Sequence, residues 1–252
     1  MRGKKLRTAT VILAAGKGTR MKSDLPKVVF KLSGKAMINR VIETANQINS
    51  EKIIVVVGYK REQVKAEIGN QANIEYAVQE PQMGTGHAVM VCREALKDFE
   101  GIVFILYGDV PMLKVHTLQQ MQEVHLKEQA ACTVLTAVIS DAAQYGRIVR
   151  NEAGEFLRIV EFKDASPKEH KIKEINTGIY CFNSGSLRES LEELTNDNKQ
   201  KEYYLTDTLE ILRKKGNHIA SVILDDFTEA TGVNSLEQLE ELEKHFINEV
   251  EN

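Results

Sequence analysis

A loop of small and basic residues, LAAGKGTRM at residues 13–21, follows the first apolar segment of the chain. Its alanines and glycines let the backbone approach a ligand closely, and its successive N–H groups can surround an anion. A dinucleotide-binding fingerprint would need glycine in place of Met21, and a Walker A loop would need a glycine that Met21-Lys22-Ser23 lacks. We therefore expect a phosphate loop of another kind, with Arg20 and Lys27 opposing the phosphate charge. The alternative is a plain turn from a strand into a helix.

A second candidate is Asp109, in the segment YGDVP at residues 107–111, directly after the most apolar run of the chain. Open α/β sheets bind ligands at the carboxyl ends of their strands, and a carboxylate there can hold Mg²⁺ between phosphate oxygens. The alternative is that Asp109 caps the following helix. The six histidines form no HExxH motif, and His87 is expected to be structural.

The third candidate is QEPQMGTGH, at residues 79–87. Glutamine amides offer the donor and the acceptor that uracil O4 and N3–H require. Gly84 and Gly86 would let backbone groups approach a flat ring. The alternative is an exposed glutamine-rich turn.

Strand-like and helix-like segments alternate along the first half of the chain, which predicts an open, mostly parallel α/β sheet covered by helices on both faces. The strands expected there are residues 8–13, 52–57, 73–78, 101–106 and 130–139, and the helices are 37–48, 62–68, 86–96 and 115–127. After residue 141 we expect a hairpin (147–149 and 156–160), strands 177–182 and 218–224, and helices 186–194, 205–215 and 235–247. Ser235 is the expected N-cap of that last helix, with Gln238 at the third helical position. A single domain results, with a core at about 8–140, a mixed α/β substrate lobe at about 141–234 and a closing helix at 235–252.

Composition indicates a globular protein of 252 residues, 42% hydrophobic and 27% charged. Three cysteines without a CxxC pair favour a reduced, cytoplasmic location, and no apolar run approaches the roughly 20 residues of a membrane span. Residues 1–35 hold ten basic residues and one acidic residue, which suits a polyanionic ligand, although the basic tail at 2–7 explains four of them. No basic helix or aromatic-interleaved basic patch is present, so we expect no nucleic-acid partner.

These segments together resemble the N-terminal uridyltransferase domain of bacterial bifunctional N-acetylglucosamine-1-phosphate uridyltransferase / glucosamine-1-phosphate acetyltransferase. The resemblance runs from about residue 10 to residue 239. The motifs that match are LAAGKGTRM, LPK (25–27), GTGHA (84–88), YGDVP, YGR (145–147), IVEFKDA (159–165), EINTGIY (174–180), EYYLTD (202–207) and GVN (232–234). The first motif is shared by sugar-nucleotide pyrophosphorylases in general, whereas the combination of the later ones is far more specific.

The resemblance implies a Rossmann-like nucleotidyltransferase sheet and a role for each matching residue. The triphosphate would contact Leu13, Ala14, Ala15, Gly16 and Arg20, with Lys27 on the reacting phosphates. Uracil would contact Gln79, Gln82, Gly84 and Thr85. The amino sugar and ribose would lie among Tyr107, Gly108, Tyr145, Gly146, Glu161, Asn176 and Thr177. Asp109 and Asn234 would hold Mg²⁺. For Glu161, the alternative is a surface carboxylate near Lys163.

The implied reaction joins UTP to N-acetylglucosamine-1-phosphate and releases pyrophosphate, with positioning and charge neutralisation as the main contributions of the protein. Arg20, Lys27 and Asp109 would be the catalytic residues. The family continues with hexapeptide repeats that acetylate glucosamine-1-phosphate and form a trimer, whereas this sequence ends at Asn252 without them. We therefore expect no acetyl transfer and a monomer or weak dimer. The alternatives are a pyrophosphorylase for another pair, such as glucose-1-phosphate with UTP or dTTP, a non-catalytic sugar-nucleotide-binding regulator, and a scaffold protein.

Overall fold

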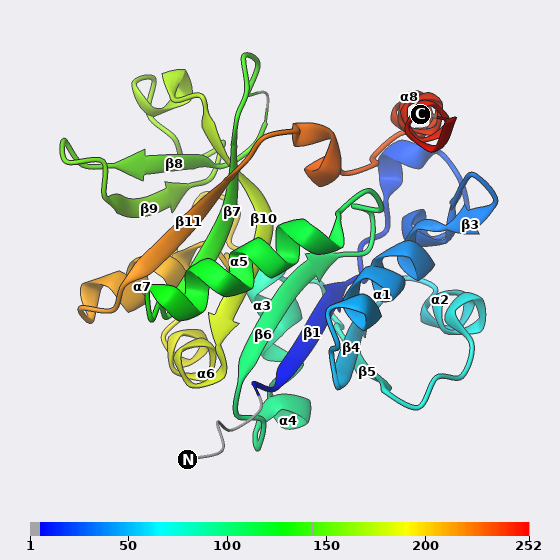
Figure 1. Cartoon of the computed structure of the whole chain (residues 1–252), viewed down its shortest axis with the longest axis horizontal. Helices are drawn as coiled ribbons and strands as arrows, with labels where there is room; N and C mark the ends of the chain where they lie inside the picture. Colours follow the sequence, from blue (N-terminus) through cyan, green and yellow to red (C-terminus); the bar gives the residue numbers. More distant parts are fainter. Residues whose placement is uncertain (1–5, 143, 252) are drawn as a thin grey trace.

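The computed structural model describes residues 6–142 and 144–251 (Figure 1), so residues 1–5, which include most of the basic tail, Ala143 and Asn252 lie outside the described residues. Its main sheet follows the order β11 (Ile219–Leu224), β7 (Cys132–Val138), β10 (Glu174–Asn183), β6 (Ile102–Tyr107), β1 (Thr8–Leu13), β4 (Lys52–Val57) and β5 (Ile74–Val78). β1 pairs in parallel with β4 and β6, β4 with β5, and β7 with β11. Only β10 runs antiparallel to its two neighbours in this row, β6 and β7. The expected open, mostly parallel α/β sheet is confirmed.

Successive residues of the central strands point to opposite faces of the sheet, and both faces are buried. Ile12 belongs to one core, whereas Val11 and Leu13 belong to the other. The first core is closed by α1 (Met37–Gln47), α2 (Arg61–Ile68) and α5 (Val115–Lys127). The second is closed by α3 (Thr85–Met90), α4 (Arg93–Leu96), α6 (Ser184–Glu192) and α7 (Asp207–Lys214). This double burial explains why the strands are continuous apolar runs without polar alternation.

A hairpin of β8 (Arg147–Arg150) and β9 (Phe156–Val160) extends from the main sheet beyond β10, at the left of Figure 1. Its turn is held by the Asn151 side chain, whose Oδ1 accepts hydrogen bonds from the backbone N–H groups of Ala153 and Glu155 at 3.0 and 2.8 Å. β8 joins the sheet through one register pair, Arg147 opposite Ile175. Although β10 and β11 lie in the part of the sequence expected to form the lobe, both strands belong to the main sheet. The division into core, lobe and closing helix stays a prediction.

The C-terminal helix α8 (Leu236–Glu251) packs on the small hairpin of β2 (Lys31–Leu32) and β3 (Lys35–Ala36), as Figure 1 shows at the upper right. Leu239 and Leu242 of α8 share a third apolar cluster with Leu32 and Met37. Ser235 Oγ accepts a hydrogen bond from Gln238 N at 3.3 Å, as expected of an N-cap. The helix therefore ties the C-terminal end of the chain to its N-terminal quarter.

Two expected elements differ from the structure. The helix expected at 86–96 is two helices, α3 and α4, because the chain tightens where Cys92 N donates to Val89 O, an i to i−3 bond. The strand expected at 177–182 begins earlier, at Glu174, and its register shifts between Asn176 and Tyr180. All three cysteines are buried and free, and no described helix is both long and apolar enough to cross a membrane.

Candidate active site

A cavity of about 470 Å³ opens at the carboxyl ends of β1 and β6, where open α/β sheets commonly bind ligands. Most of the expected site residues line it: Leu13, Ala14, Ala15, Gly16, Lys27, Gln79, Gln82, Gly84, Thr85, Tyr107, Asp109 and Asn234. The fold therefore brings the glycine-rich loop, the glutamine segment, the end of β6 and the segment before α8 to one place.

Lys27, Asp109 and Asn234 form a compact charged cluster in this cavity. The Lys27 ammonium donates to Asn234 Oδ1 at 2.8 Å and also contacts Asp109 Oδ2. The Lys27 and Asp109 side chains are only 15% and 13% exposed, so their attraction is less screened than that of a surface pair. Asp109 does not cap the following helix, because its carboxylate bonds Lys27 and α5 begins only at Val115.

The same cluster tests whether these residues suit a metal ion. One carboxylate oxygen and one amide oxygen already face a single cationic nitrogen, and both are hard oxygen ligands of the type Mg²⁺ prefers. The described residues include no group of three or more His, Cys, Asp or Glu side chains that could hold a metal. A metal ion at Asp109 and Asn234 would therefore need further oxygens from a bound ligand or water.

Asn234 lies near Asp109, and both contact Lys27, because the backbone N–H groups of its segment are held by hydrogen bonds. Val233 N donates to the Asp109 carbonyl at 2.9 Å, and Asn234 N donates to Gln238 Oε1 at 2.8 Å. The second bond links Asn234 to the first turn of α8. Asp109 and Asn234, which are 125 positions apart in the sequence, are thereby held close together at the cavity.

Gly18 allows the glycine-rich loop to lie against Lys27. It adopts φ +63°, and a Cβ atom there would lie 2.6 Å from Lys27 Cβ, closer than side chains tolerate. Two short 3₁₀ helices, η1 (Thr19–Met21) and η2 (Lys27–Val29), flank the intervening segment. No α-helix begins until Met37, so the loop is not a plain turn from a strand into a helix.

The glutamine segment forms another part of the cavity wall. Gln79 is 5% exposed, and its Nε2 donates to the Gly84 carbonyl at 2.9 Å and lies 3.4 Å from His87 Nδ1. Burial lowers the pKa of His87, which favours a neutral, structural ring. Because the Gln79 amide nitrogen is engaged by the protein, its oxygen is the group left to accept a hydrogen bond from a ligand. The exposed-turn alternative therefore fails for Gln79, whereas Glu80, Pro81 and Gln82 are exposed.

A second group of expected residues lies beyond Tyr107. Burial, and then the negative charges of Glu161 and Asp109, raise the pKa of the Tyr107 hydroxyl, so both carboxylates lie within electrostatic reach of it. Burial also raises the pKa of Glu161, whose Oε1 accepts a hydrogen bond from Thr206 Oγ1 at 3.0 Å. Lys163 bonds Gln200 instead, so the surface-pair alternative for Glu161 does not hold.

Seven expected residues do not line the cavity itself: Arg20, Gly108, Tyr145, Gly146, Glu161, Asn176 and Thr177. Gly146 lies beside Glu161, and its carbonyl accepts a hydrogen bond from Asn176 N at 2.9 Å. The Asn176 and Thr177 side chains bond Tyr180 and the Leu135 carbonyl.

Two of these seven residues, Gly108 and Arg20, lie apart from the group around Glu161. Gly108 packs under the cavity, where a Cβ atom would meet Ile38. Arg20 is exposed, and its charge lowers the pKa of Tyr145, whose net shift upward is dominated by burial. Arg20 therefore lies on the Tyr145 side of the site.

Three cavity residues were not expected: Val28, Ala88 and Glu202. Val28 follows Lys27 directly, and Ala88 lies in the GTGHA motif three residues after Thr85, so proximity in sequence could have indicated them. Glu202 begins the EYYLTD motif, which carried part of the resemblance but had no role assigned to its first residue.

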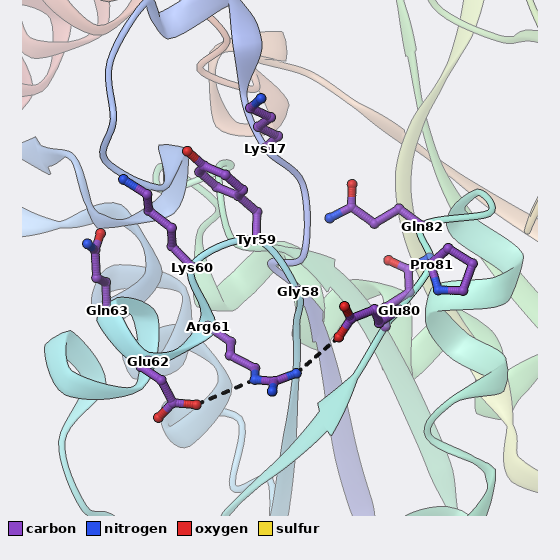
Figure 2. A pocket seen from close by; sticks show the side chains of 11 residues that line it. Lys17, Gly58, Tyr59, Lys60, Arg61, Glu62, Gln63, Glu80, Pro81 and Gln82 are labelled. Carbon is purple, nitrogen blue, oxygen red and sulfur yellow. Dashed lines mark hydrogen bonds and ion pairs between the residues drawn. The ribbon is translucent and has the colours of Figure 1, made fainter.

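A larger cavity, of about 740 Å³, lies beside the first, with Gln79 and Gln82 in the wall common to both. Figure 2 shows Lys17, Tyr59 and the Arg61–Glu80 ion pair around it. The Lys17 ammonium lies 5.6 Å from the centre of the Tyr59 ring. Lys17 thus serves this second cavity, although it belongs to the glycine-rich loop. We place the chemistry in the smaller cavity, because Asp109, Lys27 and Asn234 are there.

Comparison with known proteins bears on this site. The sequence model of the family described as "Nucleotidyl transferase" matches residues 9–238. The chain is 50% identical over 235 residues to the bifunctional protein GlmU of Brevibacillus brevis and 47% identical over 234 residues to that of Geobacillus sp. (strain WCH70). Each match covers 93% of this chain and 50% of the relative, so the chain spans about half the length of these curated relatives.

Solved structures share the fold. A UDP-glucose pyrophosphorylase complexed with UDP-glucose superposes with a TM-score of 0.74 at 22% identity, covering 97% of this chain and 100% of that one. A putative glucose-1-phosphate thymidylyltransferase from Bacillus anthracis gives a TM-score of 0.72 at 18% identity, covering 94% of each chain. At these identities the likeness establishes the fold alone.

Proposed function

This chain belongs to the nucleotidyl transferase family, and we propose that it forms UDP-N-acetylglucosamine and pyrophosphate from UTP and N-acetylglucosamine-1-phosphate. The similarity to GlmU proteins supports the choice of substrates, because it extends over 93% of this chain. The observation that carries the proposal is the Lys27–Asp109–Asn234 cluster, which lies in the same cavity as the Gln79 amide. Groups that could neutralise phosphate charge and a group that could bind the base thus lie in one cavity.

In the proposed reaction, a phosphate oxygen of the sugar phosphate forms a bond to the α-phosphorus of UTP. The bond from that phosphorus to the oxygen bridging to the β-phosphate breaks, and pyrophosphate leaves with the electron pair. Both reactants are anions, so their alignment and the neutralisation of their charge are the main tasks of the protein. No side-chain nucleophile is required.

Lys27 and the glycine-rich loop would provide most of that neutralisation. Ala15 and Gly16 line the cavity, and their backbone N–H groups would suit phosphate oxygens, while Lys27 supplies a full positive charge. A divalent metal ion, Mg²⁺ in our proposal, would be held by Asp109 and Asn234 and would offset charge on the phosphate oxygens. Lys27 would then leave these two oxygens and turn toward the phosphates. The catalytic role of Arg20 stays a prediction.

The base and the sugar would bind at the two ends of the site. Gln79 Oε1 would accept the N3–H of uracil, since its amide nitrogen is held by the Gly84 carbonyl. Glu161 would accept a hydrogen bond from a sugar hydroxyl beside Gly146, and Asn176 lies next to that pair. The cytoplasmic location and the monomeric or weakly dimeric state also stay predictions.

The test is a pyrophosphate-release assay with the purified chain, Mg²⁺, UTP and N-acetylglucosamine-1-phosphate. Replacement of the sugar phosphate by glucose-1-phosphate, and of UTP by dTTP, identifies the preferred pair. Asp109→Ala should lower kcat by roughly 10²-fold or more while leaving the chain folded. The matched control is Asp98→Ala, because Asp98 is exposed and lies in a different cavity.

Each outcome has a distinct reading. Faster turnover of glucose-1-phosphate than of N-acetylglucosamine-1-phosphate would indicate a pyrophosphorylase for another sugar phosphate. A folded chain that binds UTP but turns over no sugar phosphate would favour the non-catalytic regulator.

A further inference from the structure

Glu229 is a buried carboxylate in the short 3₁₀ helix η4 (Phe227–Ala230) and is only 5% exposed. Its Oε2 accepts a hydrogen bond from Thr117 Oγ1 at 2.6 Å and from Lys114 N at 3.4 Å, and its Oε1 lies 3.5 Å from Lys114 Nζ. Removing an ionised carboxylate from water is unfavourable unless it is paired and hydrogen-bonded. Here all the pairing groups come from one place, the start of α5.

The start of α5 needs such a partner. The first N–H groups of a helix have no acceptor within the helix, and the positive end of the helix dipole favours an anion there. Lys114, the N-cap residue, makes no side-chain capping bond of its own. Glu229, from a distant part of the sequence, therefore accepts the N–H of this N-cap residue and the hydroxyl of Thr117 in the first turn of α5.

This contact lies close to the proposed metal ligands on both chain segments. Asp109 precedes Lys114 by five residues, and Glu229 precedes Asn234 by five residues. The two segments meet again where Val233 N donates to the Asp109 carbonyl at 2.9 Å. Glu229 at one end and the Val233–Asp109 bond at the other thus join the two segments that carry Asp109 and Asn234.

We propose that Glu229 is a positioning residue, which holds Asn234 against Asp109 by fixing η4 to the start of α5. The proposal rests on the function proposed above, since it assigns Asp109 and Asn234 to the metal. Loss of the Glu229 contact should free the segment before α8 and let the two ligand oxygens separate.

The test uses the full chain with Glu229→Ala, Glu229→Gln and Thr117→Val, and two readouts besides turnover. The first is Mn²⁺ binding in the presence of UTP, followed by electron paramagnetic resonance. The second is hydrogen exchange of the Val233 amide, which reports opening of its bond to Asp109. Glu229→Ala should weaken Mn²⁺ binding by roughly 10-fold, the scale of residues that orient metal ligands, and should speed Val233 exchange.

Conservative variants separate positioning from general stability. Glu229→Gln keeps one carbonyl oxygen, which can accept from Thr117 Oγ1 and Lys114 N, but it loses the charge and the oxygen that faces Lys114 Nζ. Its effect should therefore be smaller than that of Glu229→Ala, and it serves if Glu229→Ala does not fold. Thr133→Val is the matched control, because it removes a buried bond of 3.0 Å to His125 at the other end of α5. It should lower thermal stability without changing Mn²⁺ binding or Val233 exchange.

Wild-type Mn²⁺ binding and Val233 exchange in Glu229→Ala would overturn the proposal, and so would equal changes in Thr133→Val. A failure of the proposed function is distinguishable, because Val233 exchange reports the Glu229 contact even if the chain turns over no sugar phosphate. If Asp109→Ala binds Mn²⁺ as the wild type does, the metal assignment is wrong, and the exchange result still decides whether Glu229 holds the segment.

Discussion

At the residue scale, Lys27 occupies the place where a metal ion would contact Asp109 and Asn234. An ammonium group between these oxygens repels a divalent cation, and at a few ångströms in a partly buried site the repulsion amounts to several kcal/mol. We predict that Lys27→Met strengthens Mn²⁺ binding to the nucleotide-free chain by at least about tenfold. The same change should lower kcat by roughly 10²- to 10³-fold, because the charge opposing the phosphates is lost.

Paramagnetic titration and pyrophosphate release measure these two effects. Lys22→Met is the control, since Lys22 is an exposed lysine of the same loop and has no contact with Asp109 in the described structure. Weaker metal binding in Lys27→Met would show that Lys27 supports the metal site rather than competing for it.

Gln79 gives the second residue-scale prediction. Uracil presents a hydrogen-bond donor at N3 and cytosine an acceptor, so a fixed Gln79 Oε1 leaves a buried group unpaired when CTP binds. A penalty of about 1–3 kcal/mol per group predicts roughly 5- to 150-fold lower kcat/KM for CTP than for UTP. Gln79→Ala should reduce this ratio. If Gln82→Ala reduces it and Gln79→Ala does not, Gln82 rather than Gln79 recognises the base.

At the element scale, the sequence predicted most strands and helices but not how β10 joins the sheet. Apolar runs buried on both faces are detectable locally, which is why β1 and β4 match their expected ranges. β10 inserts antiparallel between β6 and β7, a pairing that depends on contacts far apart in the sequence. The strand was expected to begin at residue 177, whereas β10 already includes Asn176, which bonds Tyr180, and Gly178 adopts φ +86° at the register shift. Such a bulge re-aims side chains toward a site.

Helix α7 begins at Asp207, and its burial there leads to a pH-dependent prediction. Burial, then the charges of Glu210 and Glu161, raise the pKa of Asp207 from its ordinary 3.8 to about 6. Between pH 3.8 and about 6, Asp207 carries a proton more often in the folded chain than in the unfolded chain. The contribution of protonated Asp207 to the free energy of unfolding is therefore full below pH 4 and is lost as the pH rises through 6. Asp207→Asn mimics the neutral acid. It should match the wild type below pH 4 and exceed it above pH 6, by at most about 3 kcal/mol.

Denaturant unfolding of both proteins at each pH gives the difference directly. Absolute curves are less informative, because burial lowers the pKa of His125 to about 4, and this contribution has the opposite sign. Asp98→Asn, at an exposed position, is the matched control for the loss of a carboxylate. An Asp207→Asn variant that is no more stable at pH 8 than the wild type would contradict the assignment.

At the scale of the whole molecule, the sequence predicted individual residues of the site but not which of them contact one another. Motif resemblance indicated Lys27, Asp109 and Asn234 separately. Their contact spans 82 and 207 residues, distances at which no local pattern predicts which atoms meet. The same limit applies to Glu202, which reaches the cavity from the segment before α7. The fold, rather than the motifs, determines that these groups face one another.

Because the site joins segments from Leu13 to Asn234, ligand binding should stabilise the whole fold. UTP with Mg²⁺ at 100 times its Kd contributes about 2.7 kcal/mol, which corresponds to a rise in Tm of roughly 5–10 °C for a chain of this length. UTP alone should give a smaller rise, since Lys27 is then still held by Asp109 and Asn234. Asn234→Ala should retain the rise with UTP alone and lose the further increment that Mg²⁺ adds. Thermal unfolding with and without each ligand measures both increments, and equal increments in wild type and Asn234→Ala would show that Asn234 does not contact the metal.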